Sequence, residues 1–397
     1  MRVAAICFAL LAVLVSGAAA APLTSSFSAG LLGVLSGKPK LIFGAKKTFK
    51  IVSFSDMHFG EGEDVDWGPQ QDVNTSHVHS VVLDNERPDF VVFNGDLLTG
   101  ENLFKENATK YLDQVWAPTV ERNIPFASTH GNHDNSFNIT HEEEINYEIA
   151  QHGKTLSYTR SDVGPRPYGL GNYWVPVYTK ASDVKPAVIL WFFDSRSFVT
   201  GEAGPVPAAA DYYWVDENTV PTYIEEQSAL MKRVWGSLPR ALVFVHIPVQ
   251  KADDLAPLPS AGDHDDEPDP SAQGFLNNVY TGLDLPFWNA VVSHLNGGPY
   301  GGNVLAVTSG HDHGESWCAR STDSSGIPIC FNGHSGYGGY ATTHSQVRNG
   351  RAFELKLSDL VKKSPTVRSW NSYEDCTTNE HVILGPHYMP QYNDVAR

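Results

Sequence analysis

The chain has 397 residues, of which 41% are hydrophobic and 18% charged, a composition typical of globular proteins and unlike disordered or coiled-coil chains. Its formal net charge of −17 at pH 7 argues against a nucleic-acid partner, because binding a phosphate backbone requires clustered Lys and Arg. The same acidity disfavours an anionic substrate unless bound cations reverse the local field.

Residues 1–20 have the features of a secretory signal peptide. Arg2 supplies the positive start, Ile6 to Val15 form an apolar stretch, and Ala18 to Ala20 fit the small-residue rule for cleavage. The apolar stretch is shorter than the about 20 residues that a membrane-spanning helix needs. We therefore expect secretion rather than a membrane anchor, with residues 21–47 leading into the fold.

Secretion has two chemical consequences for the mature chain. We expect glycan acceptors on surface loops at three Asn-x-Ser/Thr sequons, Asn74, Asn107 and Asn138. An oxidising compartment favours a disulfide, and Cys318 with Cys330 would close a short loop. Cys376 remains as an alternative partner for either of them.

The first half of the chain predicts alternating strands and helices. Strands are expected at 49–55, 89–94 and 124–128, with helices at 73–86 and 108–122 between them. A polar cluster follows each strand, and the three clusters are Asp56 with His58, Gly95-Asp96, and Asn132-His133-Asp134. Because ligand sites of open α/β sheets lie beyond the carboxyl ends of the strands, this order favours an α/β fold with one shared site.

The second half continues the pattern less regularly. The expected elements are helices at 142–151 and 219–236, strands at 188–193, 241–245 and 303–309, and an edge strand at 352–357. Residues 157–180 are expected to form a long excursion and 251–273 an acidic surface loop. His246 follows one strand, and Gly310-His311-Asp312-His313 follow another. No linker separates two apolar-rich halves, so we expect a single domain at 48–360 and a surface tail at 361–397.

Together the clusters offer the ligands that a pair of metal ions requires. Two cations about 3.5–4 Å apart need a bridging carboxylate and several further N or O ligands. The candidates are Asp56, His58, Asp96, Asn132, His246, His311 and His313. Because imidazole and carboxylate are mixed and Cys is absent from the set, Fe, Mn, Zn or Co suits the site better than Ca²⁺.

The order of the clusters resembles the calcineurin-like metallophosphoesterase superfamily, whose blocks run Asp-x-His, Gly-Asp, Gly-Asn-His-Asp/Glu, His and Gly-His-x-His. The resemblance spans residues 49 to about 345 and implies a four-layer α/β/β/α sandwich. The segments Trp191 to Arg196 and Gly274 to Trp288 look most like the fungal and plant proteins described as purple-acid-phosphatase-like.

Carried over by position, the resemblance assigns Asp56, His58 and His313 to one metal ion and Asn132, His246 and His311 to the second, with Asp96 as the bridge. His133 would contact the phosphate or protonate the leaving group, and Asp134 would orient it. Arg196 is a candidate for gripping phosphate, although a structural ion pair explains it equally well. His334 and Tyr337 on a glycine-rich turn are candidates for the border of the site.

One departure from purple acid phosphatases concerns the metal ligands. Those enzymes carry Gly-Asp-x-x-Tyr, whose phenolate binds ferric iron, whereas this chain has Thr99 at that position. It also has His58 where those enzymes typically have Gly. We therefore expect no tyrosinate ligand and no purple colour.

The motifs predict a secreted hydrolase of small phosphoesters, most simply monoesters, in which a metal-bridged hydroxide attacks phosphorus. A phosphodiesterase acting on cyclic nucleotides, nucleic acid or a phospholipid head group would share the same motifs. A metal-free binding scaffold is the third alternative, and degenerate ligands would be its signature. The oligomeric state and the physiological substrate are left open by the sequence.

Overall fold

The computed structural model describes residues 38–166, 168–197, 212–255, 262–266, 272–276 and 279–386. The predicted signal peptide and residues 21–37 of the expected leader lie outside these residues. Within the described part of the chain, no helix combines the length and the apolar character needed to cross a membrane.

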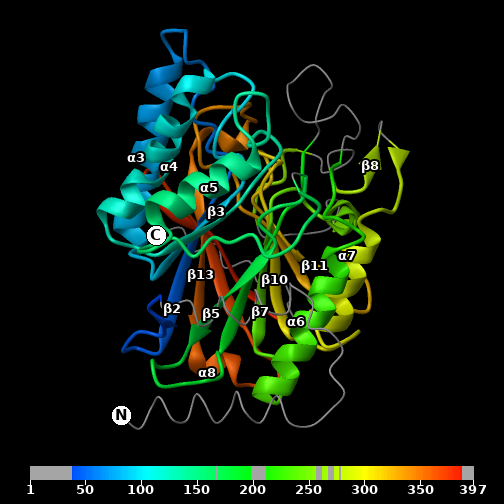
Figure 1. Ribbon diagram of the computed structural model, residues 1–397. Helices are drawn as coiled ribbons and strands as arrows, with labels where there is room; N and C mark the ends of the chain where they lie inside the picture. Colours follow the sequence, from blue (N-terminus) through cyan, green and yellow to red (C-terminus); the bar gives the residue numbers. More distant parts are fainter. Residues whose placement is uncertain are drawn as a thin grey trace.

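Two β-sheets form the centre of the molecule, with helices on the outer face of each (Figure 1). The seven-stranded sheet has the order β1 (Leu41–Ile42), β5 (Tyr173–Tyr178), β6 (Val188–Phe193), β7 (Arg240–Val245), β10 (Val304–Ser309), β12 (Pro328–Phe331) and β11 (Cys318–Arg320). The six-stranded sheet has the order β15 (Thr378–Leu384), β14 (Val367–Tyr373), β13 (Asn349–Lys356), β2 (Thr48–Phe54), β3 (Phe90–Asn94) and β4 (Phe126–Thr129). Strands β8 (Phe275–Leu276) and β9 (Val279–Tyr280) form a separate hairpin.

The helices alternate with the strands along the chain. Strands β2 to β4 of the six-stranded sheet are each succeeded in the sequence by a helical segment, and these segments are α3 (Gly68–Glu86), η1 (Lys105–Asn107) with α4 (Ala108–Glu121), and α5 (His141–His152). The helical segments that come after strands β6 and β7 of the seven-stranded sheet are α6 (Val220–Trp235), η2 (Gln250–Leu255), α7 (Leu285–Ala290) and η3 (Val291–Leu295). Two short elements, η4 (His344–Gln346) and α8 (Leu357–Leu360), flank β13.

Three apolar clusters separate the layers. The inner cluster joins both sheets, for example through Phe244 of β7 and Phe353 of β13, whose ring centroids lie 6.2 Å apart. A second cluster packs α3 and α4 on the six-stranded sheet, and a third packs α6 and α7 on the other. Each sheet therefore buries both faces, which explains the long apolar runs of its central strands. The predicted four-layer α/β/β/α sandwich is confirmed.

Parallel pairing brings the carboxyl ends of the central strands to one edge of the sandwich. Strands β2, β3 and β4 are parallel, with Phe54 opposite Phe93 and Asn94 opposite Thr129. Strands β6, β7 and β10 are parallel as well. The residues that follow these strands are the polar clusters noted in the sequence, so the fold concentrates them at one end.

Three expectations about the later chain are wrong. Residues 157–180 include β5, which was missed because Pro176 within it cannot donate a ladder hydrogen bond. Strand β13 lies between β14 and β2 and is not an edge strand. The segment expected to be a surface tail contributes β14 and β15 to the six-stranded sheet, so the expected domain boundary at 360 falls inside the fold.

The covalent and modification sites have mixed outcomes. Cys318 and Cys330 lie opposite each other on β11 and β12 and form the predicted disulfide, while Cys376 is free and exposed. Asn107 and Asn138 lie outside the α-helices and strands and are partly exposed. Asn74 is partly exposed but lies within α3, so the expectation that this sequon is in a loop is wrong.

Candidate metal centre

Two groups of ligating side chains lie at the carboxyl ends of the strands. Asp56, His58 and His313 form the first group, and in each group the ligand atoms all lie within 4.8 Å of one another. Asp96, His246 and His311 form the second. The two groups draw on loops after β2, β3, β7 and β10, and thus on both sheets. The structure thereby brings together six of the seven ligands predicted from the sequence as two triads.

The carboxylates of Asp56 and Asp96 lie between the two triads. The Asp96 Oδ2 atom lies 3.1 Å from His246 Nε2 and 3.7 Å from His58 Nε2, so it is within reach of both groups. The Asp56 Oδ1 atom lies 3.5 Å from His313 Nε2 and 3.9 Å from His246 Nε2. A carboxylate between two groups of imidazole nitrogens is the arrangement that a pair of cations about 3.5–4 Å apart requires. This geometry supports Asp96 as the bridging ligand.

Several buried polar atoms at this place have no hydrogen-bond partner among the residues that the structure describes. They include Asp56 Oδ2 and Asn132 Oδ1. Because a buried polar atom without a partner is costly, such atoms indicate a ligand that satisfies them. Asn132, the seventh predicted ligand, is 5% exposed and fits this group. The donor set of imidazole, carboxylate and amide oxygen therefore fits two divalent transition-metal ions.

The backbone of the ligand loops is strained. Asp56, His58, Asp96 and His311 all have positive φ, at 56°, 49°, 49° and 76°. Non-glycine residues avoid this region, and such residues concentrate at functional sites because the surrounding fold holds them there. The strain turns each side chain toward the same point and identifies the loops as preorganised.

Glycines beside the ligands allow a close approach. A Cβ atom on Gly95, whose φ is 90°, would lie 2.3 Å from His246 Nδ1. One on Gly131 would lie 2.2 Å from Asp96 Oδ1. Both distances are shorter than real Cβ contacts, so these positions require glycine. The Gly-Asp and Gly-Asn-His motifs thus have a steric origin.

Hydrogen bonds to Nδ1 orient three of the ligand imidazoles. His246 Nδ1 is 2.8 Å from the Asn94 carbonyl oxygen, and His313 Nδ1 is 2.6 Å from the Tyr340 carbonyl oxygen. His58 Nδ1 lies 3.0 Å from the hydroxyl of Thr99, which donates to Glu61 at 2.6 Å. Contacts at Nδ1 leave Nε2 for a metal ion and fix the direction of each ring. Thr99, at the position of the tyrosine of purple acid phosphatases, here contacts a ligand.

Burial and charge act against each other in the second triad. Burial favours the neutral form of His246, but Asp96 and Asp56 outweigh it and raise the pKa of His246 to about 10. Burial would raise the pKa of Asp96, yet His246 and His133 hold that pKa well below its usual range. Burial lowers the pKa of His311 to about 3. In the metal-free second triad, the protein therefore holds a charged pair, His246 and Asp96, beside the neutral imidazole of His311.

His133 lies beside the triads but has a different partner from the one expected. Its ring is 5.0 Å from that of His58, and its Nδ1 is 2.5 Å from Glu101 Oε1. Burial would lower the pKa of His133, but Asp96 and Glu101 raise it to about 9. Asp134 instead accepts backbone N–H bonds from Gly131, Leu97 and Leu98. The orienting carboxylate is therefore Glu101, and the expectation for Asp134 is wrong because its oxygens hold the two loops together.

The three candidate substrate contacts lie away from the open side of the centre. Arg196 is buried, donates to Trp214 and to the carboxylates of Asp216 and Glu217, and is thus a structural ion pair. His334 is buried behind His313, with ring centroids 4.0 Å apart. The Tyr337 hydroxyl bonds to Glu374. None of the three lines the pocket described next, so the structure does not support these candidates.

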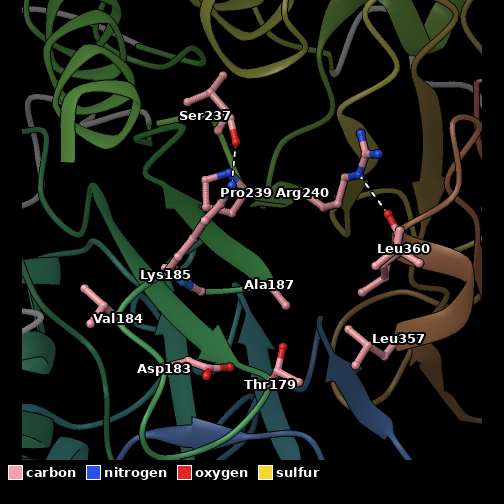
Figure 2. A pocket seen from close by; sticks show the side chains of 13 residues that line it. Thr179, Asp183, Val184, Lys185, Ala187, Ser237, Pro239, Arg240, Leu357 and Leu360 are labelled. Atoms are coloured by element: carbon pink, nitrogen blue, oxygen red, sulfur yellow. Dashed lines mark hydrogen bonds between the residues drawn. The ribbon is translucent and has the colours of Figure 1, made fainter. Parts of the chain in front are cut away.

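A pocket of about 380 Å³ opens over the two triads. Its lining residues are His58, Glu61, Asp96, Thr99, Glu101, His133, Asp266, His311, Asp312, His313, Gly339 and Tyr340. A larger cavity of about 720 Å³ lies at the other end of β6 and β7, near Arg240 and Leu360 (Figure 2). Arg240 there donates to the Leu360 carbonyl, and among the described residues no group of metal-ligating side chains lines that cavity. The chemistry therefore belongs to the smaller pocket.

Sequence reasoning gave no role to six residues of this pocket, Glu61, Glu101, Asp266, Asp312, Gly339 and Tyr340. Glu101 follows the Gly-Asp motif by five residues, and that closeness is the one signal that could have directed attention to it. Asp266 lies in the segment expected to be a solvated acidic loop, and nothing in its neighbourhood in the sequence indicates the pocket. Tyr340 ends the glycine-rich turn, but only the fold shows its ring against His313.

Comparison with known proteins gives consistent results. The chain is 27% identical over 353 residues to "Probable inactive purple acid phosphatase 28" of Arabidopsis thaliana, covering 83% of this chain and 81% of that protein. It is 28% identical over 330 residues to "Phosphatase DCR2" of Saccharomyces cerevisiae, covering 78% of this chain and only 52% of the yeast protein. This chain thus spans about half of that phosphatase.

Solved structures are similar at low identity. A dimetal phosphatase from Danio rerio aligns with a TM-score of 0.47 and 12% identity, covering 86% of this chain and 99% of that one. The purple acid phosphatase PPD1 from yellow lupin aligns with a TM-score of 0.45 and 13% identity, covering 85% of this chain and 53% of that one. Both scores are below 0.5, so the family assignment rests on the sequence. Residues 49–335 match the family model of the calcineurin-like phosphoesterases, and the chain belongs to that family.

Proposed function

We propose that this protein is a secreted, dimetal-dependent hydrolase of phosphate monoesters. The observation that carries the proposal is the pair of ligand triads beneath a pocket with His133 in its wall. Every ligand position holds a side chain that can bind metal, whereas a scaffold that had lost catalysis would be expected to show degenerate ligands. The word "inactive" in the name of the plant relative concerns that protein. The disulfide between Cys318 and Cys330 supports an oxidising compartment.

Asp56, His58 and His313 would hold one divalent ion, and Asn132, His246 and His311 the other, with Asp96 between them. Two such ions would lower the pKa of a bound water molecule and would offset the negative charge of the phosphoryl oxygens. Five of the six triad ligands are buried, and only His311 is partly exposed, which strengthens these electrostatic interactions.

His133 is the group that can handle a proton. Its ring faces the pocket while Glu101 holds Nδ1, which leaves Nε2 free to bond a phosphoryl oxygen or the ester oxygen. In hydrolysis, the oxygen of water bonds to phosphorus, the ester P–O bond breaks, and the departing alcohol oxygen takes a proton. The carboxylate of Glu101 favours the protonated form of His133, so this ring is suited to give that proton to the leaving oxygen.

The test is to purify the protein, measure bound transition metal, and compare hydrolysis of p-nitrophenyl phosphate with that of bis-p-nitrophenyl phosphate. We expect about two equivalents of metal and faster cleavage of the monoester. Cleavage of the diester alone would establish a phosphodiesterase instead. Less than one equivalent of metal together with no cleavage of either ester would refute the enzyme proposal.

A further inference from the structure

The end of strand β6 carries buried polar residues that belong to neither triad. The strand ends at Phe193, and Asp194 and Ser195 follow it directly, with exposed fractions of 1% and 0%. Strand β6 pairs with β7, after which His246 comes. The Phe193 carbonyl also accepts a hydrogen bond of 2.8 Å from the hydroxyl of Thr129, at the end of β4 in the other sheet. The segment therefore lies where the ligand-bearing ends of the two sheets meet.

Asp194 is connected to the turn that carries Asn132 through a buried imidazole. His141, the first residue of α5, has its Nδ1 atom 3.5 Å from Asp194 Oδ2 and donates from Nε2 to the Gly131 carbonyl at 2.7 Å. That carbonyl belongs to the peptide group that joins Gly131 to Asn132. Because both ring nitrogens face acceptors, the imidazole is held in one orientation. The carboxylate of Asp194 is fixed in turn by two backbone N–H bonds of 2.7 Å each.

Ser195 contacts the loop that carries His246. Its hydroxyl oxygen accepts a hydrogen bond of 3.0 Å from the backbone N–H of Ile247, the residue after His246. Asn132 follows the six-stranded sheet and His246 the seven-stranded sheet, so their separation depends on how the loops of the two sheets are held together. A metal ion such as Zn²⁺ binds nitrogen and oxygen ligands at about 2.0–2.2 Å, which leaves little tolerance for a change in that separation.

On the basis of the metal ligands assigned in the proposed function, we propose that His141, Asp194 and Ser195 are positioning residues of the second metal site. Asp194 and His141 hold the turn that carries Asn132. Ser195 holds the loop that carries His246. Together they set the separation of two ligands that come from different sheets. The imidazoles of the first triad are oriented by other contacts, so the ion bound there should not depend on these three residues.

The test measures Zn²⁺ affinity at each metal site separately. His58→Ala removes a ligand of the first site and His311→Ala a ligand of the second, so each background leaves the other site as the tighter one. Metal-free protein is titrated with Zn²⁺ in competition with a chromophoric chelator. The shorter amide of His141→Asn does not extend as far as the imidazole Nε2, so it should weaken binding about tenfold or more in the His58→Ala background. In the His311→Ala background it should leave the affinity unchanged.

Further variants separate positioning from general damage to the fold. His141→Gln keeps an N–H donor close to the position of Nε2 and should restore most of the affinity. Ser195→Ala removes a single hydroxyl and should weaken the second site severalfold. The matched controls are His79→Asn, which removes an equally buried imidazole bonded to the Thr119 hydroxyl, and Ser53→Ala, which removes a buried hydroxyl within β2. Both controls should leave the affinity of the second site unchanged.

Metal affinity is a readout that does not depend on catalysis, so the two proposals can fail separately. Unchanged second-site affinity in His141→Asn and Ser195→Ala, or equal losses at both sites, would overturn the positioning role, even if the wild-type protein cleaves p-nitrophenyl phosphate. Ser195→Ala decides the outcome if His141→Asn does not fold. If the wild-type protein binds two Zn²⁺ ions and these variants weaken only the second, but no ester is cleaved, the proposed function fails and the positioning role stands.

Discussion

The partnership between Glu101 and His133 gives the sharpest test of the site. In Glu101→Gln the carboxylate that accepts from His133 Nδ1 at 2.5 Å becomes a neutral amide. A hydrogen bond to a charged group contributes about 1.5–3 kcal/mol, and the low end applies because the side chains are 31% and 39% exposed. A loss of about 1.5 kcal/mol in the transition state corresponds to about a tenfold lower rate.

The assay separates proton donation from general damage by varying the leaving group. Nitrophenolate departs without a proton, whereas an alkyl alcohol needs one. Glu101→Gln should therefore lower kcat about tenfold for an alkyl phosphate and clearly less for p-nitrophenyl phosphate. Glu106→Gln removes a nearby exposed carboxylate in η1 and should change neither rate.

An equal loss for both leaving groups would refute the role of Glu101 in holding a proton donor. So would a leaving-group effect that is larger in Asp134→Asn than in Glu101→Gln, because Asp134 contacts only backbone N–H groups of the two loops among its hydrogen bonds. Asp134→Asn should instead lower the melting temperature.

The remaining predictions concern the metal ions, the disulfide and acid stability. Asp96→Asn should bind less than one equivalent of metal and lose activity while remaining folded by circular dichroism, and full activity would mean that the bridge lies elsewhere. Replacing Cys318 and Cys330 by Ser together should lower the free energy of unfolding in urea by about 3 kcal/mol, since the bridge spans 12 residues. Burial lowers the pKa of His79 to about 3 in the folded state. In the unfolded chain this imidazole takes up a proton below about pH 6.5, whereas in the folded chain it does not. The free energy of unfolding therefore falls by up to about 1.4 kcal/mol per pH unit as the pH falls from 6.5 toward 3, and His79 has no such effect above pH 6.5. His79→Leu should flatten the pH dependence of the unfolding free energy in that window, and an unchanged slope would show that His79 is charged in the fold.

The metal ligands could be predicted from the sequence because they follow the ends of strands that are recognisable from local sequence patterns. Runs such as Val188–Phe193 are apolar throughout since both faces of a central parallel strand are buried, and such strands are recognisable without the fold. Parallel strands place their carboxyl ends at one edge, so polar clusters that follow them converge. Asp56, Asp96 and His246 could therefore be brought together from their place in the chain alone.

Strand β14 could not be recognised, because several of its buried positions carry polar residues. Ser369, Asn371 and Ser372 are fully buried within it. The buried guanidinium of Arg351 on the neighbouring β13 bonds Ser369 and lies 3.5 Å from Glu380 of β15. These long-range partners replace apolar contacts, and a pattern based on hydrophobic alternation does not detect them.

The contacts around the metal centre were decided by the tertiary structure in the same way. The motif placed Asp134 next to His133, but strand ends and strained loops turn Asp134 toward backbone N–H groups and bring Glu101 to the imidazole. Glu61, Asp266 and Tyr340 come from three separate segments and meet only at the pocket. A ligand set that follows strand ends is encoded locally, whereas the surroundings that govern proton transfer and substrate choice depend on where distant loops come to lie.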